Sequence, residues 1–489
     1  MEVSASPWRR LAAICLAAAL VLTARTATAD QPQLKVAVGE IDITPKFGPG
    51  ARPIWLSGYG QNRRATSIHD PLLARAVILE AGQQRIALVS VDLLGLQLPA
   101  VQAMRKELGS AVDYLVVSST HNHEGPDTVG IWGPNPLTCG VDPDYISLVV
   151  GRVAQLVKQL CTQTTPAVAE YGVAQDDSLL GDSRLPKVFD GVLRVLRFRS
   201  ADDPQQTLGV LVQWNCHPEA MGRQNTELTA DFVGYTVEAL EKRVAAPVAY
   251  FTGAVGGLMA PPGGRFQDEQ GQDLPRGHFR YTETYGRAVA ELAEKALSAA
   301  RPIRLTDEAG FVVSTKPIAV PLVNPIYRMA KALGVIRRDG RVWTGDFEKL
   351  GPIRIAEQRG EVSAVETEVA YLRLGELHVA CIPGEVYPEL VYGEIQQPVE
   401  PGADFPDAPL EEPIVKILPG EKILILGLAN DEIGYILPKR QWDELPPFCY
   451  GRTRSQYGEI NSVGPDAGPI IMQALRNRVD EAQARPAQD

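Results

Sequence analysis

Two histidines separated by one residue follow directly on an apolar run, at the end of residues 116–123, Val-Val-Ser-Ser-Thr-His-Asn-His. In an extended chain, residues i and i+2 point to the same side, so His121 and His123 can enter one pocket. Neutral imidazole is a preferred ligand of zinc. Two surface histidines in a turn would give the same spacing, but the position at the end of a buried strand favours metal binding or catalysis.

Three other apolar runs also end at polar residues capable of metal binding or proton transfer, followed by Pro or Gly. These ends are His217, Glu385 and the segment 429–435. Ligand sites on open α/β sheets lie beyond the carboxyl ends of the strands, so we expect the ends to meet. Two imidazoles, a carboxylate and one open position are typical of a catalytic rather than a structural zinc site.

The elements that must position these residues alternate along the chain. Strands are predicted at residues 85–93, 113–119, 207–216, 247–252, 377–382 and 422–428. Helices are predicted at residues 144–160, 232–244, 281–299 and 325–333. This alternation predicts a single large α/β domain with a mixed, substantially parallel sheet. Polar loops at 263–277 and 397–413 interrupt it, and the second is long enough to be a lid or binding loop.

The first residues are typical of a secretory signal. Arg9 and Arg10 precede an apolar run over 11–22, and Ala27-Thr28-Ala29 follows as a small-residue cleavage site. The run is about a dozen residues, short of the ~20 needed to span a bilayer. We therefore expect a signal peptide over 1–29, cleavage after Ala29, and a mature catalytic domain over 30–489. That domain would be exported, periplasmic or secreted, without a stable membrane span.

The charge and cysteine content limit the molecules that the chain is expected to bind and the bridges it can form. The formal net charge is −11 and is spread along the chain, which argues against nucleic acid, because its binding needs clustered Lys and Arg. Beyond residue 29 the chain has an odd and sparse set of cysteines rather than a disulfide framework. They leave room for one bridge, such as Cys139 with Cys161 or Cys449.

The segments resemble the neutral, non-lysosomal ceramidase family, whose members are exported zinc amidases. The resemblance runs from residues 38–45 to residues 456–459 and so covers nearly all of the predicted mature chain. Its landmarks are Gly58-Tyr59-Gly60, Thr120-His121-Asn122-His123, His217, Pro383-Gly384-Glu385, Gly427-Leu428-Ala429-Asn430 and Gly434-Tyr435.

The resemblance implies a set of site residues. By it, the zinc ligands would be His121, His217, Glu385 and Tyr435. His123, Arg184 and Tyr457 would contact the substrate, with Arg184 suited to a carboxylate or phosphate.

One departure from the family concerns a serine. Family members carry it in an Asn-x-Gly-Asp-Val-Ser-Pro loop, whereas residues 251–257 here read Phe-Thr-Gly-Ala-Val-Gly-Gly, with Gly256 in its place. This excludes a mechanism that depends on serine at this position. Gly256 and Gly257 either let backbone N–H groups approach a substrate oxyanion or form only a tight turn.

A second departure follows His123, where the family has small residues and this chain has Glu124 and Asp127. Either carboxylate could orient the reacting water, support a ligand histidine or recognise a polar or cationic group, and a solvated turn is the alternative. Both disfavour a long acyl chain. About thirty residues follow Tyr457, so we expect this chain to lack the all-β domain that follows in ceramidases, and no amphipathic surface helix is evident. We therefore expect an N-acyl substrate that is lipid-like or soluble.

The expected mechanism uses zinc to lower the pKa of a bound water towards ~7. His123 would move the proton to the leaving amine, with Glu124 or Asp127 as competitors, and Tyr435 or Tyr457 would stabilise the oxyanion. Two other classes fit less well. A binuclear metallohydrolase, a phosphodiesterase or lactonase, would need a final histidine that this His-x-His motif lacks. The second alternative class is a non-catalytic binding protein with the same fold.

Overall fold

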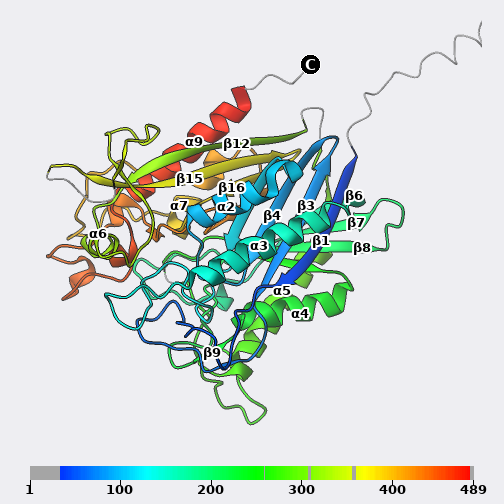
Figure 1. Ribbon diagram of the computed structural model, residues 1–489, viewed down its shortest axis with the longest axis horizontal. Coiled ribbons are helices and arrows are strands. Elements are labelled where there is room, and N and C mark those ends of the chain that lie inside the picture. The colour runs from blue at the N-terminus through cyan, green and yellow to red at the C-terminus, as the bar shows by residue number, and fades with distance from the viewer. Residues whose placement is uncertain (1–32, 258, 307–309, 355–359, 485–489) are drawn as a thin grey trace, which may run out of the picture.

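The computed structural model describes residues 33–257, 259–306, 310–354 and 360–484. The predicted signal peptide lies outside these residues. Two β-sheets pack face to face, and helices cover their outer surfaces (Figure 1). Among the described residues, no helix is long and apolar enough to cross a membrane. The five cysteines in this part of the chain are all free, so none of them forms the bridge for which the sequence left room.

The first sheet has the strand order β10-β8-β7-β6-β1-β3-β4-β5, with β11 paired to β6. Its strands are β1 (Leu34–Asp42), β3 (Leu73–Ala81), β4 (Gln84–Val91), β5 (Tyr114–Ser119), β6 (Thr165–Gln175), β7 (Val192–Ser200), β8 (Thr207–Trp214), β10 (Val248–Thr252) and β11 (Arg301–Ile303).

The second sheet has the order β14-β13-β15-β16-β18, with β12 paired to β15. Its strands are β12 (Phe311–Pro321), β13 (Gly340–Val342), β14 (Ile353–Arg354), β15 (Ser363–Leu374), β16 (Leu377–Cys381) and β18 (Ile423–Leu426). Two small parallel pairs join β17 (Glu385–Val386) to β19 (Tyr435–Ile436), and β2 (Ser67–Ile68) to β9 (Glu227–Leu228).

The helices are α2 (Leu98–Leu108), α3 (Pro143–Leu160), α4 (Asp231–Val244), α5 (Phe279–Ala299), α6 (Pro325–Ala332), α7 (Pro388–Tyr392), α8 (Ile414–Ile417) and α9 (Ala467–Ala484). The four predicted helices correspond to α3, α4, α5 and α6, with bounds within two residues of those expected, whereas α2, α7, α8 and α9 were not predicted. Short 3-10 helices lie at Gly109–Ala111, Asp177–Leu179, Lys439–Gln441, Cys449–Gly451 and Glu459–Asn461. The N-terminus of α3 shows why the sequence folds this way: the Asp142 carboxylate accepts the Asp144 N–H, and Pro143 occupies the first helical position.

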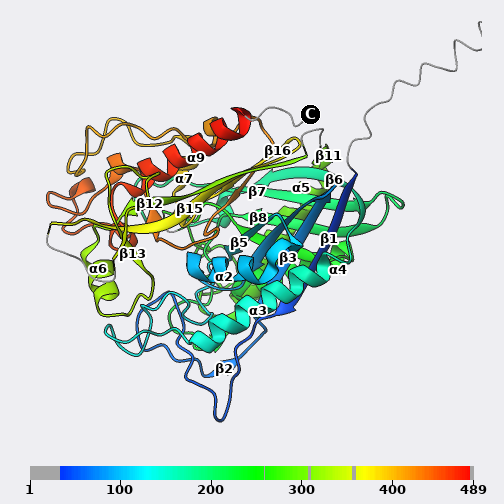
Figure 2. The ribbon, with the colours of Figure 1, turned by 45° about the horizontal axis from the view of Figure 1, so that its top comes forward.

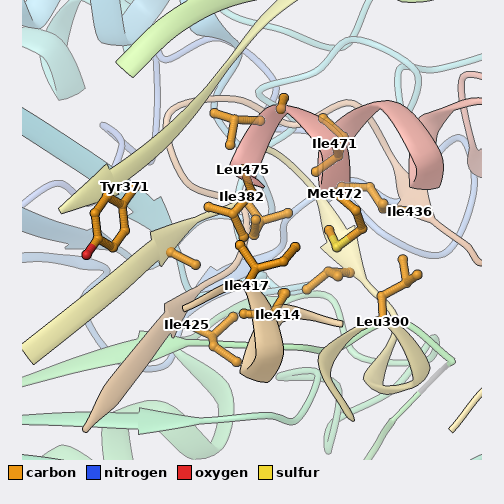
Figure 3. Packing of buried hydrophobic residues seen from close by; sticks show 14 of the residues in the cluster. Tyr371, Ile382, Leu390, Ile414, Ile417, Ile425, Ile436, Ile471, Met472 and Leu475 are labelled. Carbon is orange, nitrogen blue, oxygen red and sulfur yellow. The ribbon is translucent and has the colours of Figure 1, made fainter. Parts of the chain in front are cut away.

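The core between the sheets is made by apolar residues from their facing surfaces, such as Leu79 of β3, Leu372 of β15 and Leu424 of β18. Helices α2 and α3, and α4 and α5, cover the first sheet (Figure 2). On the far side, α7, α8 and α9 cover the second sheet. Figure 3 shows Ile471 and Leu475 of α9 in the same cluster as Ile382. The sheets are thereby held as one body, with the strand ends fixed relative to one another.

The mixed α/β fold predicted from the sequence is confirmed, although most neighbouring strands are antiparallel. The reason lies in two-residue turns: Gly82-Gln83 joins β3 to β4 and Gly375-Glu376 joins β15 to β16, with both glycines in the left-handed region. A turn this short permits only antiparallel pairing. The larger sheets are parallel at β4–β5, β8–β10 and β16–β18, and α2 and α4 make the first two crossovers. These parallel strands lead to the candidate site.

Candidate metal centre

Four polar residues meet where strands of the two sheets end. His121 follows β5, His217 follows β8, and Glu385 and Tyr435 follow β16 and β18. Glu385 and Tyr435 are themselves directly paired in the parallel ladder of β17 and β19. Each of the four side chains is at least nine-tenths buried. The expectation that the strand ends converge therefore holds geometrically for these four positions.

The ligand atoms of these residues face one another. His217 Nε2 lies 2.9 Å from Glu385 Oε2, and His121 Nε2 lies 3.2 Å from the same oxygen. The Tyr435 hydroxyl is 3.5 Å from His217 Nε2. Burial alone would raise the pKa of Glu385, but the charge and hydrogen bonds of His121 and His217 bring it below its usual value. The carboxylate is therefore ionised and can act as a ligand.

Backbone carbonyls orient the two imidazoles. His121 Nδ1 lies 2.8 Å from Leu94 O, and His217 Nδ1 lies 2.8 Å from Met259 O. A carbonyl can only accept, so each Nδ1 carries a hydrogen. Nε2 donates to Glu385 while the ring is protonated, and it offers a lone pair to a metal once that proton is lost. Metal-binding histidines are commonly held in this way. His121 also has a φ of 69°, and its N–H donates to Leu93 O at 3.0 Å, so an uncommon backbone conformation is fixed by hydrogen bonds.

These side chains fit a metal ion. The ligand atoms of His121, His123 and His217 all lie within 4.8 Å of one another, so these side chains form a group that could hold a metal ion. The donors are imidazole nitrogens together with the oxygens of Glu385 and Tyr435, which zinc and similar transition metals accept. These residues could therefore hold a metal. This is the one such group of three or more His, Cys, Asp or Glu residues in the described part of the chain.

His123 differs from its two neighbours in its hydrogen bonding. Its ring centre lies 5.0 Å from that of His121 and 5.7 Å from that of His217. Neither ring nitrogen has a hydrogen-bond partner, although Nδ1 is 3.8 Å from Glu219 Oε2. Burial, followed by the neighbouring histidines, lowers the pKa of His123 well below its usual value. The side chain is therefore neutral, with one ring nitrogen free to accept a hydrogen bond or bind a metal and the other free to donate.

The Gly58-Tyr59-Gly60 turn packs directly on His123. The Tyr59 ring lies edge-on at 4.9 Å, and a Cβ at Gly58 would come 2.4 Å from His123 Nδ1. Gly58 also has a φ of 99°, so two independent constraints require glycine there. The turn holds the imidazole in place without hydrogen bonding to it.

A cavity opens beside this cluster. Its polar wall includes Glu385, Tyr435 and Tyr457, and Tyr457 is 47% exposed at the rim. Most of the remaining surface is apolar, from Leu94, Val129, Ile131, Trp132, Leu322, Ile336, Ala364, Val365, Ile433 and Val463. Tyr457 is thus at the cavity, as predicted, whereas the 397–413 loop contributes no residue to its lining.

Glu432 also lines the cavity, and it was missed as a site residue. Its Oε1 accepts the Gly434 N–H at 2.8 Å, whereas its buried Oε2 has no hydrogen-bond partner. Burial, together with Glu385, raises the pKa of Glu432 well above its usual value. Asn430, with a φ of 65°, holds this turn because its Oδ1 accepts the Val117 N–H at 3.0 Å. The sequence analysis had singled out the segment 429–435 that contains Glu432. Within this segment, however, Asp431-Glu432 looks like an ordinary turn.

Glu124 is turned away from the cavity, contrary to the catalytic role predicted for it. Its Oε2 accepts from Arg63 at 2.7 Å and from Asn225 at 2.9 Å, and the side chain is fully buried. Burial raises the pKa of Glu124 to about 8, against the opposing effect of Arg63. A buried carboxylate needs such partners, and here they come from the protein itself. Glu124 does not line the cavity.

Asp127 also makes its hydrogen bonds within the protein. Its carboxylate accepts the N–H groups of Val129, Gly130 and Trp132 at 2.9, 2.7 and 3.0 Å. These bonds order the loop that supplies Val129, Ile131 and Trp132 to the cavity wall. The predicted catalytic or substrate-recognition role is therefore not supported, and Asp127 shapes the cavity from behind.

Arg184 does not reach the cavity either. Its two terminal nitrogens bind the carboxylate of Glu459 at 2.8 and 2.7 Å, and one also donates to Tyr457 O at 3.1 Å. Its guanidinium lies 5.5 Å from the centre of the Tyr387 ring. The predicted contact with a substrate anion is replaced by a buried ion pair that fixes the backbone of Tyr457.

Gly256 packs against the segment that carries Glu385. Its N–H donates to Val386 O at 3.0 Å, so this group is not free for an oxyanion. A Cβ there would come 2.4 Å from the Tyr387 ring and 2.8 Å from Glu385 O. Gly257 has a φ of 81°. Of the two interpretations of these glycines, the geometry favours the tight turn.

The fold and the site define a class: a mixed α/β protein whose strand ends form a buried His and Glu cluster, able to hold a metal, at an apolar cavity. No family model matches the chain. The neutral ceramidases of Drosophila melanogaster and Drosophila pseudoobscura pseudoobscura are each 26% identical to it over 229 residues, covering 42% of this chain and 32% of theirs. The match thus spans about a third of these curated relatives.

Solved structures extend the similarity. The neutral ceramidase of Pseudomonas aeruginosa superimposes with a TM-score of 0.66 at 15% identity, covering 94% of this chain and 76% of that one. A ceramidase complexed with C2 gives a TM-score of 0.65 at 16% identity, covering 94% and 77%. The chain is therefore similar in sequence to neutral ceramidases over part of its length, and it shares the fold of the solved ones, in line with the resemblance seen in its motifs.

Proposed function

We propose that this chain is an exported zinc-dependent hydrolase that cleaves the amide bond of an N-acyl compound. The observation that carries the proposal is the approach of His217 Nε2 and His121 Nε2 to one carboxylate oxygen of Glu385, at 2.9 and 3.2 Å, beside an apolar cavity. Similarity to neutral ceramidases supports the choice of an amide bond. The nitrogen and oxygen donor set supports zinc, and the signal-like residues 9–29 support export.

In this proposal His121, His217, Glu385 and Tyr435 hold the ion, and His123 faces the substrate. The ion would supply Lewis acidity, which polarises a carbonyl and lowers the pKa of water. The carbonyls of Leu94 and Met259 keep the histidine rings in the tautomer that this task needs.

Tyr435 and Tyr457 would stabilise negative charge on the carbonyl oxygen. Their rings meet edge to face, with centres 5.9 Å apart. Burial raises the pKa of Tyr435 well above its usual value and that of Tyr457 to about 12. Both hydroxyls therefore keep their hydrogen at neutral pH and can donate it in a hydrogen bond.

His123 would move the proton. It is neutral, and neither of its ring nitrogens is committed to a partner within the protein. It can take a proton from water and deliver it to the leaving amine, with Glu219 at 3.8 Å to stabilise the transient imidazolium. Gly256 supplies no nucleophile, so the reaction uses water.

The positions of two acidic residues remove one argument against a lipid-like substrate. The two acids that disfavoured an acyl chain, Glu124 and Asp127, point into contacts of their own. The wall that the substrate would meet is mostly apolar. The apolar part of this wall supports a lipid-like substrate.

The test combines metal analysis with turnover of N-acyl amines, N-acyl amino acids, ceramides and simple esters. We expect one zinc per chain and amide hydrolysis, both lost in His217→Ala. The exposed His278, outside this cavity, provides the matched control His278→Ala, which should keep both. Two ions per chain would favour the binuclear alternative. Ligand binding without turnover that survives His121→Ala would favour the binding-protein alternative.

A further inference from the structure

Asn461 lies beside Tyr457 at the cavity, and its side chain reaches the phenol. Both residues line the cavity, and Asn461 Nδ2 donates a hydrogen bond to the Tyr457 hydroxyl oxygen. The Asn461 side chain makes no other hydrogen bond within the described part of the chain. Its amide therefore serves a single partner, a group proposed to stabilise negative charge on the substrate.

The direction of this hydrogen bond determines where the hydrogen of Tyr457 points. A phenol has one hydrogen to donate and an oxygen that can accept. An amide N–H can only donate, so the oxygen is the acceptor in this pair and the Tyr457 hydrogen turns away from Asn461. Among the residues that the structure describes, none accepts a hydrogen bond from the Tyr457 hydroxyl. Its hydrogen is therefore left for a group that enters the cavity.

Backbone contacts hold Asn461 in place. Its N–H donates to Gly458 O at 2.9 Å, and its carbonyl oxygen accepts from the Tyr327 hydroxyl at 3.1 Å. Gly434 packs against the same carbonyl, since a Cβ at Gly434 would overlap the Asn461 oxygen. Gly434 directly precedes Tyr435. The position of Asn461 is thereby fixed relative to the candidate metal centre.

The effect of Asn461 on the Tyr457 pKa agrees with this direction. Burial raises the pKa of Tyr457 to about 12, and the hydrogen bond from Asn461 acts in the opposite sense, because it stabilises negative charge on the phenol oxygen. Hydrogen bonds in a chain polarise one another, so a phenol that accepts one becomes a stronger donor. Asn461 therefore strengthens Tyr457 as a donor while the phenol keeps its hydrogen at neutral pH.

We propose that Asn461 is a positioning residue that turns the Tyr457 hydrogen towards the carbonyl oxygen of the substrate. The hydrogen bond between the two residues is a property of the resting protein, whereas its use on a substrate carbonyl rests on the proposed function. A donor that is already oriented stabilises a developing oxyanion without rearranging during the reaction. Asn461 acts through Tyr457 and has no contact of its own with the reacting atoms.

A double-mutant cycle in the zinc-loaded protein tests whether Asn461 acts through Tyr457. Asn461→Ala should lower kcat for amide hydrolysis by roughly fivefold, the size of one hydrogen bond, with KM nearly unchanged. Tyr457→Phe should lower kcat further, because the donor itself is lost. Adding Asn461→Ala to Tyr457→Phe should then cost nothing more. An equal cost of Asn461→Ala in the parent and in Tyr457→Phe would overturn the proposal.

Carbon NMR of protein labelled at tyrosine Cζ measures the hydrogen bond without turnover, and the Tyr457 signal is the one missing in Tyr457→Phe. In Asn461→Asp the phenol must donate to a carboxylate. Its signal should therefore move towards the position of a phenolate, and kcat should fall by roughly tenfold or more as the hydrogen leaves the substrate. The control is Asn135→Asp, which should change neither. Asn135 is exposed and outside the cavity, and aspartate would retain its acceptor for the Leu137 N–H, now at 2.9 Å.

The two measurements separate this proposal from the proposed function. If the Tyr457 signal moves in Asn461→Asp but the parent hydrolyses no amide, the chemistry is refuted and the hydrogen bond stands. If the signal stays at the parent position, the proposal is overturned, whatever the turnover. Thermal unfolding of the Asn461 variants should stay close to that of the parent, because the backbone contacts of Asn461 are retained.

Discussion

The strand-end cluster and the charged residues just outside it are equally well buried, yet their polar atoms are used in opposite ways. In the cluster, His121, His217 and Glu385 direct their atoms at one another around one point. Outside it, Glu124 and Arg184 direct theirs into ion pairs with Arg63 and Glu459. Burying a charge is costly unless partners satisfy it. Because Glu124 and Arg184 lie outside the cavity lining and form ion pairs within the protein, they are not in a position to contact a substrate.

The comparison also shows that closeness in sequence is a poor guide to the chemistry. Glu124 immediately follows His123 but lies outside the cavity, whereas Glu432, more than three hundred residues later, lines it with a free oxygen. We therefore expect substitutions in the cluster to remove function without unfolding the chain. Substitutions in the surrounding pairs should unfold it without changing the chemistry of molecules that remain folded.

The largest effect is expected for Glu385→Ala, which removes the carboxylate that His121 and His217, the two histidines proposed as ligands, both approach. Bound zinc should be lost. Because removal of one electrostatic donor already costs on the order of a hundredfold to a thousandfold in rate, turnover should fall at least that far. Metal content and amide hydrolysis measure the effect, and circular dichroism should show a folded chain. The exposed Glu394 gives the control Glu394→Ala. Full zinc content in Glu385→Ala would show that this carboxylate is not a ligand.

Next comes Arg184→Met, which leaves Glu459 buried without its partner. Breaking a buried ion pair costs about 3–5 kcal/mol in the free energy of unfolding, and urea denaturation would measure it. Arg184→Met/Glu459→Met should recover part of that loss, because no lone charge remains. Folded molecules should keep one zinc per chain. If Arg184→Met left stability unchanged and raised KM only for substrates with an acidic group, the result would favour the original prediction that Arg184 contacts the substrate.

A smaller loss is expected when the family serine is introduced. Gly256→Ser places a Cβ 2.4 Å from the Tyr387 ring, and crowding of this kind costs roughly 1–3 kcal/mol. Thermal unfolding would measure it, with Gly263→Ser as control, since a Cβ there meets nothing within 4 Å. Amide hydrolysis should not rise. A rise in activity at unchanged stability would mean that the loop has room for the serine.

Much of the fold and of the candidate cluster could be predicted because the relevant signals are local. Apolar runs gave β5, β8, β16 and β18 almost to the residue, and the polar residue after each run pointed to the strand ends. The pairing of the strands was harder, because a parallel or antiparallel arrangement depends on turns such as Gly82-Gln83 and on partners far away in the chain.

The predictions were wrong mainly about where side chains point, because this depends on contacts that no local sequence pattern specifies. Arg184 was expected to meet a substrate, but its partner is Glu459, 275 residues away. Helix α6 illustrates the same limit: its apolar spacing fits a buried face as well as an exposed one. Only the packing shows that Ile326 and Met329 face solvent.

Glu432→Gln should have the smallest effect and sharpens the comparison most. The amide keeps the acceptor for the Gly434 N–H and removes the acid that faces Glu385. If the free Oε2 contacts the substrate, kcat/KM should fall by about tenfold, the size of one hydrogen bond to a charged or polar group. Zinc content should be unchanged, and stability should stay close to that of the parent, because the raised pKa of Glu432 already keeps its side chain neutral. Kinetics at full zinc loading measure the effect, with Glu394→Gln as control. Unchanged kinetics would place Glu432 with Glu124, among the buried acids that serve only the fold.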